Sequence, residues 1–197
     1  MGGCCTKFVP DPDAQPVDLK EFKGRYWMVS TCLTMWKPEN RICPCMVWVP
    51  QPPNKKGQAY QRDITEYRTG TLEHPSELKI FDGYDTNVGS PEYPAWWQWR
   101  GVGCLSLMTS DFQMIRHAPD YRWAIVAYGT TCATPAGLDV YHREPVPPQD
   151  EMDEIERIIR DTPYLREKAG DRLFRTVQCP EGTPPNAPDA GKPQPTY

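Results

Sequence analysis

The stretch at residues 110–174 constrains the fold of this chain more than any other. It holds β-like runs rich in branched and aromatic residues, and these end at a stop formed by Pro145, Pro147 and Pro148. One amphipathic helical segment and a last short extended run follow. Hairpin strands with a single helix laid over them are typical of a small β-barrel. A barrel of that size has room for one small ligand, so this stretch predicts a container.

Further β-like runs precede this stretch and complete a barrel. The predicted strands lie at residues 25–33, 45–49, 58–68, 77–81, 95–99, 105–117, 122–128 and 138–143. We therefore predict an all-β fold, an eight-stranded antiparallel up-and-down β-barrel with one C-terminal amphipathic α-helix packed on it. The turn-rich segment at residues 82–94 is expected to be a long loop, either a lid over the barrel mouth or an excursion from it.

The helix is expected to begin near Asp150 and to end at Thr162, because a proline follows and disfavours helical backbone in the residue before it. Its apolar side chains recur on one face, which should pack on the barrel. They are Met152, Ile155, Ile158 and Ile159.

The chain divides into three expected parts. Residues 1–16 form a lead, residues 17–179 form the barrel and helix, and residues 180–197 form a Pro-rich tail with too little apolar content to pack. The formal net charge is −4 and no basic run is present, so no nucleic-acid partner is predicted. No run of about 20 apolar residues would serve as a transmembrane helix.

The start, Met1-Gly2-Gly3-Cys4-Cys5-Thr6, fits the N-myristoylation pattern M-G-x-x-x-[ST] with Gly2 as acceptor. One myristoyl chain binds membranes only marginally, and Cys4 and Cys5 are placed for a second, palmitoyl anchor. Acylation would hold the protein on a cytosol-facing membrane surface. The alternative is a flexible N-terminus with two incidental thiols.

The chain has eight cysteines, and two of them form the closely spaced group Cys43-Pro44-Cys45. This spacing has no C-x-x-C or histidine cluster beside it, so no metal site is predicted. In an oxidising compartment, Cys43 or Cys45 is expected to form a disulfide with Cys179. That expectation conflicts with a cytosol-facing location, where thiols stay reduced.

Three short motifs resemble those of the lipocalin family. Gly24-Arg25-Tyr26-Trp27 stands where the family has G-x-W-Y at the mouth of its first strand. Pro119-Asp120-Tyr121-Arg122 resembles the T-D-Y turn between the sixth and seventh strands, with Pro119 in place of the threonine. Arg143 matches the family's lone arginine, which packs over the first-strand tryptophan at the closed end. The reversed aromatic pair means that either Tyr26 takes the tryptophan's role or the register slips by one residue.

The resemblance covers residues 17–179, and the spacing from Arg143 to Phe174 is similar to that in the bacterial-type and apolipoprotein D-like branch. A second, weaker resemblance is to the lipocalin domain of violaxanthin de-epoxidase, a plastid xanthophyll-cycle enzyme. It rests on the segment FVPDP at residues 8–12, on Asp120-Tyr121, and on the positions of Cys45 and Cys179. That enzyme's Cys-rich N-terminal domain and Glu-rich C-terminal region have no counterpart here. The resemblance would imply a plastid or thylakoid-lumen location if the start is processed.

We expect the protein to bind or carry a small hydrophobic molecule, such as a lipid, sterol, retinoid, carotenoid or tetrapyrrole, at a membrane surface. The alternative for each aromatic or methionine side chain is that it simply fills the barrel. The expected lining residues are Met28, Trp48, Tyr60, Trp96, Trp99, Met114 and Trp123.

Two other functions stay open. A de-epoxidase-like enzyme would need a proton donor, and carboxylates near expected barrel-mouth loops are Glu66, Glu73, Asp82 and Asp85. No histidine or thiol pairs with them at an informative spacing, so a binder is favoured over an enzyme. The third possibility is a non-catalytic, membrane-docked subunit of a larger, photosynthetic type of complex, which would use the 82–94 loop and the tail as contacts.

Overall fold

The structure is a computed structural model that describes residues 8–39, 41–90, 93, 95–132 and 134–179. The expected acylation positions Gly2, Cys4 and Cys5 and the tail at 180–197 lie outside the described residues.

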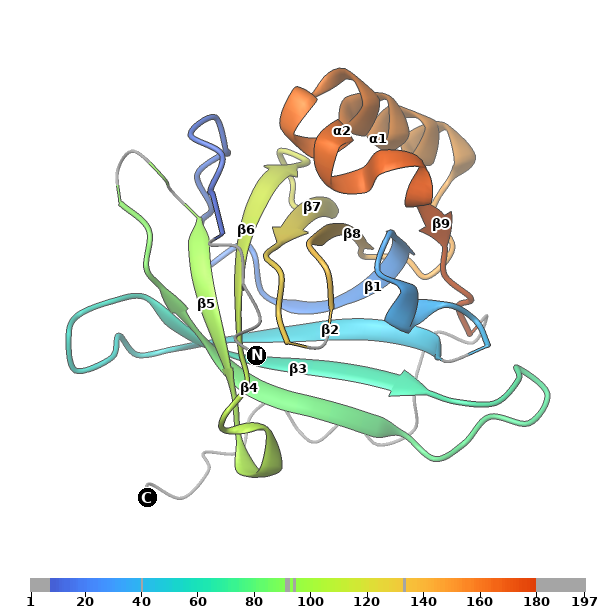
Figure 1. The fold of residues 1–197 in the computed structure, drawn as a ribbon, viewed down its shortest axis with the longest axis horizontal. Helices are drawn as coiled ribbons and strands as arrows, with labels where there is room; N and C mark the ends of the chain where they lie inside the picture. Colours follow the sequence, from blue (N-terminus) through green and yellow to red (C-terminus); the bar gives the residue numbers. More distant parts are fainter. Residues whose placement is uncertain (1–7, 40, 91–92, 94, 133, 180–197) are drawn as a thin grey trace, which may run out of the picture.

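The described residues form a closed, eight-stranded antiparallel up-and-down barrel, as predicted (Figure 1). Its strands are β1 (Gly24–Thr31), β2 (Ile42–Gln51), β3 (Tyr60–Arg68), β4 (Lys79–Asn87), β5 (Trp96–Gly101), β6 (Thr109–His117), β7 (Trp123–Tyr128) and β8 (Gly137–His142). Each strand pairs with the next, and β8 closes the barrel on β1. The ninth strand, β9 (Phe174–Arg175), pairs with the end of β1 at Ser30 and Thr31.

Side chains along each strand alternate between the interior and the exterior, as the pleat requires. The interior cluster includes Tyr26, Met28, Met46, Trp48, Tyr67, Trp97, Phe112, Met114, Val126 and Tyr141. The outer cluster lies between the barrel and the helices and includes Trp27, Val29, Ile115, Trp123, Ile125, Leu138 and Val140. Tyr26 therefore points inward and Trp27 outward, which settles the register of the reversed aromatic pair.

Two helices follow the barrel, where one was expected. Helix α1 (Gln149–Asp161) buries Met152, Ile155 and Ile159 in the outer cluster, while Ile158 is only partly buried. Pro163 ends α1 as expected, but it also occupies the first position of a second helix, α2 (Pro163–Ala169), where its missing N–H is no loss. The two helices pack on the side of the barrel formed by β7, β8 and β1 (Figure 1).

Two expected element boundaries, those of the 82–94 loop and of the 105–117 strand, are corrected by the structure. Residues 82–87 belong to β4, which runs on as a regular partner of β3 and β5, so the expected 82–94 loop is shorter than predicted. Residues 105–108 lie outside the sheet, because a short 3-10 turn (Gly103–Leu105) precedes β6.

The described part of the N-terminal lead packs against the barrel wall. Phe8 and Ala14 are buried, and the main chain of Asp11 exchanges two hydrogen bonds with the side chain of Gln113 in β6. The Gln15 N–H also donates to the Ile115 carbonyl. Residues 8–16 are thus continuous with the packed domain.

The disulfide joins Cys43 and Cys179, with a Cα–Cα distance of 5.3 Å. Of the two cysteines left open by the sequence, Cys43 is the one that pairs. The expected Cys45–Cys179 pairing is therefore wrong. Cys45 is a free, buried thiol that accepts a hydrogen bond from Arg25 at 2.7 Å. A backbone irregularity between Ile42 and Cys45, with Cys43 at a φ of 53°, turns the Cys43 side chain toward the C-terminal segment.

Candidate functional site

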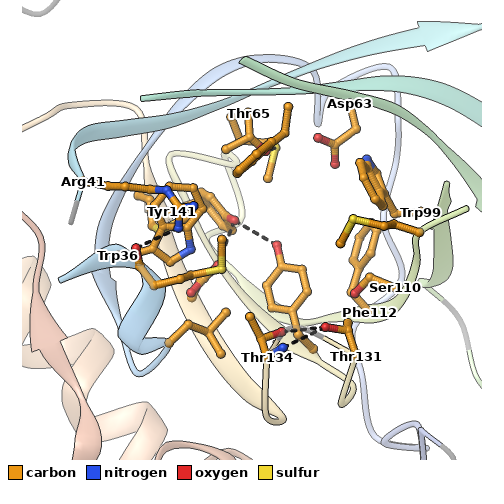
Figure 2. A pocket seen from close by; sticks show the side chains of 18 of the residues that line it. Trp36, Arg41, Asp63, Thr65, Trp99, Ser110, Phe112, Thr131, Thr134 and Tyr141 are labelled. Atoms are coloured by element: carbon orange, nitrogen blue, oxygen red, sulfur yellow. Dashed lines mark hydrogen bonds between the residues drawn. The ribbon is translucent and has the colours of Figure 1, made fainter. Parts of the chain in front are cut away.

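The barrel contains a cavity of about 340 Å³ at the end that carries the β1–β2, β5–β6 and β7–β8 loops (Figure 2). This volume lies within the range of small-molecule sites. Most of the wall is apolar. Apolar lining residues are Met28, Leu33, Met35, Trp36, Met46, Phe81, Trp99, Leu105, Met108 and Phe112.

The opposite end of the barrel is filled by aromatic side chains. Phe22 packs on Tyr26 and Trp48 with ring centroids 4.8 and 4.6 Å apart, and Trp48 packs edge-on against Tyr141 at 5.1 Å. Phe22 comes from the short turn before β1 and is 1% exposed. These rings fill and close that end of the barrel, and of them only Tyr141 lines the cavity.

The motif residues expected from the sequence meet at this closed end. The Arg143 guanidinium stands over the Tyr26 ring at 3.7 Å and donates to the Arg25 carbonyl at 2.9 Å. The Tyr26 hydroxyl donates to the Tyr121 carbonyl at 2.7 Å. Gly24 has a φ of 80°, and Arg143 lies 3.5 Å from the place where a Cβ would stand.

Asp120 links the same turn to helix α1. It pairs with Arg122, which also pairs with Glu151 of α1. Glu151 in turn accepts a hydrogen bond from His142 at 2.9 Å. These partners lower the pKa of the Glu151 carboxyl, with His142 as the largest cause. This chain of contacts sets the helix on the barrel.

The inner wall of the cavity also holds buried carboxyl groups. Asp63 in β3 lines the cavity and accepts a hydrogen bond from the Trp48 indole N–H at 3.2 Å. Asp85 in β4 lies behind it, within hydrogen-bonding reach of Asp63, and accepts from Gln61 at 2.9 Å. Burial raises the pKa of Asp63 to about 7. Burial and then the charge of Asp63 raise the pKa of Asp85 well above its usual range.

A second polar group lies on the wall formed by β7 and β8. Asp139 accepts hydrogen bonds from Thr31 at 2.5 Å and from the Tyr141 hydroxyl at 3.1 Å. The Tyr141 hydroxyl lies 2.8 Å from the Tyr128 hydroxyl. Burial raises the pKa of Asp139 to about 7 against these two hydrogen bonds, which lower it.

The rim of the cavity carries one cation. Arg41 stands over the rings of Trp36, Tyr67 and Phe81 at 5.1, 4.8 and 5.3 Å and donates to the Met35 carbonyl. The stem of Arg41 and the rings of Trp36 and Phe81 form part of the apolar wall, while the guanidinium provides hydrogen-bond donors at the entrance.

Of the expected lining residues, Met28 and Trp99 line the cavity. Trp48 and Met114 lie in the interior cluster without lining the cavity, and Trp48 belongs to the aromatic group that fills the closed end. The other three lie elsewhere. Trp123 is in the outer cluster under the helices, Trp96 packs against Phe8, and Tyr60 stacks on Tyr84.

None of the carboxylates considered for catalysis lines the cavity. Glu66 pairs with Arg25 beside Cys45, and Asp82 pairs with Arg62. Glu73 is exposed. Asp85 points inward but stands behind Asp63. Among the described residues, no three His, Cys, Asp or Glu side chains group in a way that could hold a metal ion.

Sequence reasoning missed Asp63 and Asp139. The run Gln61-Arg62-Asp63-Ile64-Thr65 is polar on both faces, so its alternation does not reveal which side chains face inward. For Asp139, the alternation of Leu138, Asp139 and Val140 shows only that the carboxylate lies on the face opposite two apolar side chains. It does not reveal that the helices cover the apolar face and that Asp139 points into the barrel.

No protein-family model matches this chain, and no curated protein matches it. No helix in the described part of the chain is long and apolar enough to cross a membrane.

Proposed function

We propose that the protein binds and carries one small hydrophobic molecule in the barrel cavity. The observation that carries this proposal is the cavity itself, which has a mostly apolar wall and lies at the loop-bearing end of a barrel whose other end is filled by aromatic side chains. Burial of apolar ligand surface in such a site releases about 25 cal/mol per Å². The methionines of the wall (Met28, Met35, Met46 and Met108) are flexible and can adapt to ligands of different outline.

We also propose that the chain is related to the lipocalins. The support is the up-and-down barrel of eight strands, the flanking helix, and the contact of Arg143 with the first-strand aromatic residue. Tyr26 holds the position expected for the family's tryptophan. This relationship would account for a cavity in the barrel.

A pair of adjacent residues on β6 allows a sharp test of the cavity. Ser110 lines it, whereas the neighbouring Thr109 is exposed on the outside. We expect the purified protein to bind the neutral probe N-phenyl-1-naphthylamine, and Ser110→Trp to weaken that binding at least tenfold by filling the cavity. The matched control Thr109→Trp should bind like the wild type. If the wild type does not bind the probe, or if both variants bind equally well, the carrier proposal is wrong and a subunit with a filled barrel is favoured.

The proposed membrane association has one supporting feature in the described residues. Leu107 is 94% exposed on the β5–β6 loop, and its neighbours Leu105 and Met108 line the cavity. An exposed leucine at the cavity entrance would insert readily into a bilayer surface when the ligand is exchanged. Leu107→Ser should slow the transfer of the probe from vesicles without changing its affinity in solution. Equal transfer rates would contradict this role.

The compartment has two competing proposals. The Cys43–Cys179 disulfide favours an oxidising compartment, whereas acylation at Gly2 requires a cytosol-facing start. We propose the oxidising compartment, because the disulfide lies within the described domain. The mass of the intact protein purified from its source, without reductant, tests this. A mass that includes a myristoyl group on Gly2 and shows that the Cys43–Cys179 disulfide has not formed would overturn it.

A further inference from the structure

The inner half of the cavity presents hydrogen-bond acceptors. The Oδ1 atom of Asp63 is buried and has no donor among the described residues. Figure 2 shows this carboxyl group pointing into the cavity. A proton shared with Asp85 would occupy one oxygen of each group, but a carboxylate has about four accepting positions. Asp63 therefore has accepting capacity directed at the space that a ligand would fill.

The opposite wall of the cavity also presents a hydrogen-bond acceptor. In the strand order, β7 lies across the barrel from β3. The Tyr141 hydroxyl gives its proton to Asp139, so its oxygen accepts the proton of Tyr128. The Tyr128 oxygen then keeps free lone pairs, and Tyr128 also lines the cavity. Both polar walls can thus accept hydrogen bonds from a ligand.

The donors of the cavity lie mainly elsewhere. Arg41, Thr131 and Thr134 lie in the loops of the rim. The Thr65 hydroxyl, which lies deeper, donates to the sulfur of Met46. A ligand with only acceptors at its inner end would leave the Asp63 oxygen without a donor, and a carboxylate at that end would lie beside a buried carboxyl group. Unpaired buried polar groups and adjacent like charges both oppose binding.

We propose that the ligand of this cavity carries a hydrogen-bond donor at its inner end: a hydroxyl, which donates to Asp63 or Tyr128, or an ammonium group, whose several N–H donors can bond both. Its apolar body then lies against the methionine and aromatic wall toward the rim. This inference rests on the proposed carrier function and adds the class of ligand: long-chain or polycyclic alcohols or amines, with fatty acids excluded.

Four ligands that share one alkyl chain test the inference. Dodecanol, dodecylamine, dodecanoate and methyl dodecanoate are titrated at pH 8 as competitors of N-phenyl-1-naphthylamine. We expect dodecanol or dodecylamine to bind about tenfold more tightly than both dodecanoate and the ester, the effect of one hydrogen bond to a charged group. The tighter of the two identifies the donor as a hydroxyl or an ammonium group. An ester that binds as tightly as the better donor would show that the pocket only repels charge, and an acid that binds equally well would show no selection. Either result overturns the inference.

Variants locate the effect. Asp63→Asn should reduce the preference for the donor ligands to less than about threefold, because the new amide satisfies acceptor ligands as well. The control Asp111→Asn changes a partly exposed aspartate of β6 that does not line the cavity, and it should keep the full preference.

If Asp63→Asn does not fold, Tyr128→Phe removes the opposite acceptor and should also reduce the preference. A preference unchanged in the folded variants contradicts the assignment. If the wild type itself does not bind the probe, the carrier function is refuted instead.

Discussion

Arg143 shows how one side chain closes the end of the barrel. Its guanidinium covers the Tyr26 ring and donates to a main-chain carbonyl, while the hydroxyl of the same tyrosine bonds the 118–123 turn. The residue thus joins the start of β1 to the end of β8. A lysine has no planar group to lie on the ring, so the two cations are not equivalent here.

Replacement of Arg143 should therefore destabilise the protein. We expect Arg143→Ala to lower the free energy of unfolding by about 2–3 kcal/mol, the sum of a partly desolvated cation–π contact and one hydrogen bond. Arg143→Lys should recover only part of this. Urea unfolding followed by tryptophan fluorescence measures the change. Arg157→Ala, which removes an exposed ion pair on α1, should change the value by less than about 1 kcal/mol. Equal effects of the two alanine variants would contradict a special role for Arg143.

Asp139 makes a second prediction at the residue scale, because burial raises its pKa to about 7 from an unfolded value near 3.8. Between these two pKa values the folded state binds more protons than the unfolded state. The contribution of Asp139 to stability is therefore complete below about pH 4 and is lost as the pH rises through 7. The full loss is on the order of 4 kcal/mol, since one pKa unit corresponds to about 1.4 kcal/mol.

The measurement compares unfolding free energies at pH 5 and pH 8. The Asp139→Asn variant has no carboxyl group to titrate at this position. The free energy of unfolding of the wild type, relative to that of this variant, should therefore be lower at pH 8 than at pH 5. Asp111→Asn should keep the pH dependence of the wild type. A constant difference between wild type and Asp139→Asn across this range would show that the carboxyl group does not titrate in the folded state near pH 7.

At the scale of elements, hydrophobic pattern predicted the strands and the helix but could not assign all side chains to a face. Trp123 shows the reason. The strand Trp123–Tyr128 is apolar on both faces, because one side meets the cavity and the other meets the helices. Backbone irregularities reverse the alternation further. They lie between Met28 and Ser30 in β1, and between Met114 and Arg116 in β6.

The hydrophobic pattern also could not predict helix α2 or the full length of β4. The end of α1 at Pro163 was predictable, but the start of α2 at the same residue depends on Leu165 and Ala169 burying against the domain. Likewise, β4 continues through polar residues because its two neighbours satisfy its main chain, a tertiary effect that its own sequence does not reveal.

Helix α1 should contribute to stability without contributing to the cavity. Ile155 is fully buried in the outer cluster, on the other side of the barrel wall from the ligand site. We expect Ile155→Ala to lower the free energy of unfolding by about 2–4 kcal/mol. Its affinity for N-phenyl-1-naphthylamine should not change under conditions where it is folded. The neighbouring exposed Glu154→Ala serves as the control and should have little effect on either quantity. A loss of probe affinity in folded Ile155→Ala would mean that the helix shapes the cavity.

At the scale of the whole molecule, the first and last segments of the described part of the chain pack on the outside of the barrel, and one end of the interior stays open. Residues 8–16 lie along β6, and the segment after the helices returns to β1 through β9. The Thr176 N–H donates to the Val29 carbonyl, and Gln178 donates to the Met28 carbonyl. The C-terminal segment therefore covers the edge of β1 where β2 diverges, next to the disulfide.

The Cys43–Cys179 bond should be the strongest single constraint on this arrangement, because it closes a loop with a sequence separation of 136. A cross-link over so long a loop removes much of the conformational freedom of the unfolded chain, and its loss typically costs about 2–5 kcal/mol. We expect Cys179→Ser, or reduction of the wild type, to lower the free energy of unfolding by that amount. Cys132→Ser removes an exposed free thiol and should have no comparable effect.

Peptide mapping without reductant decides the pairing, because Cys45→Ser should preserve the bond between Cys43 and Cys179. Loss of the bond in that variant would mean that Cys45 is the true partner of Cys179.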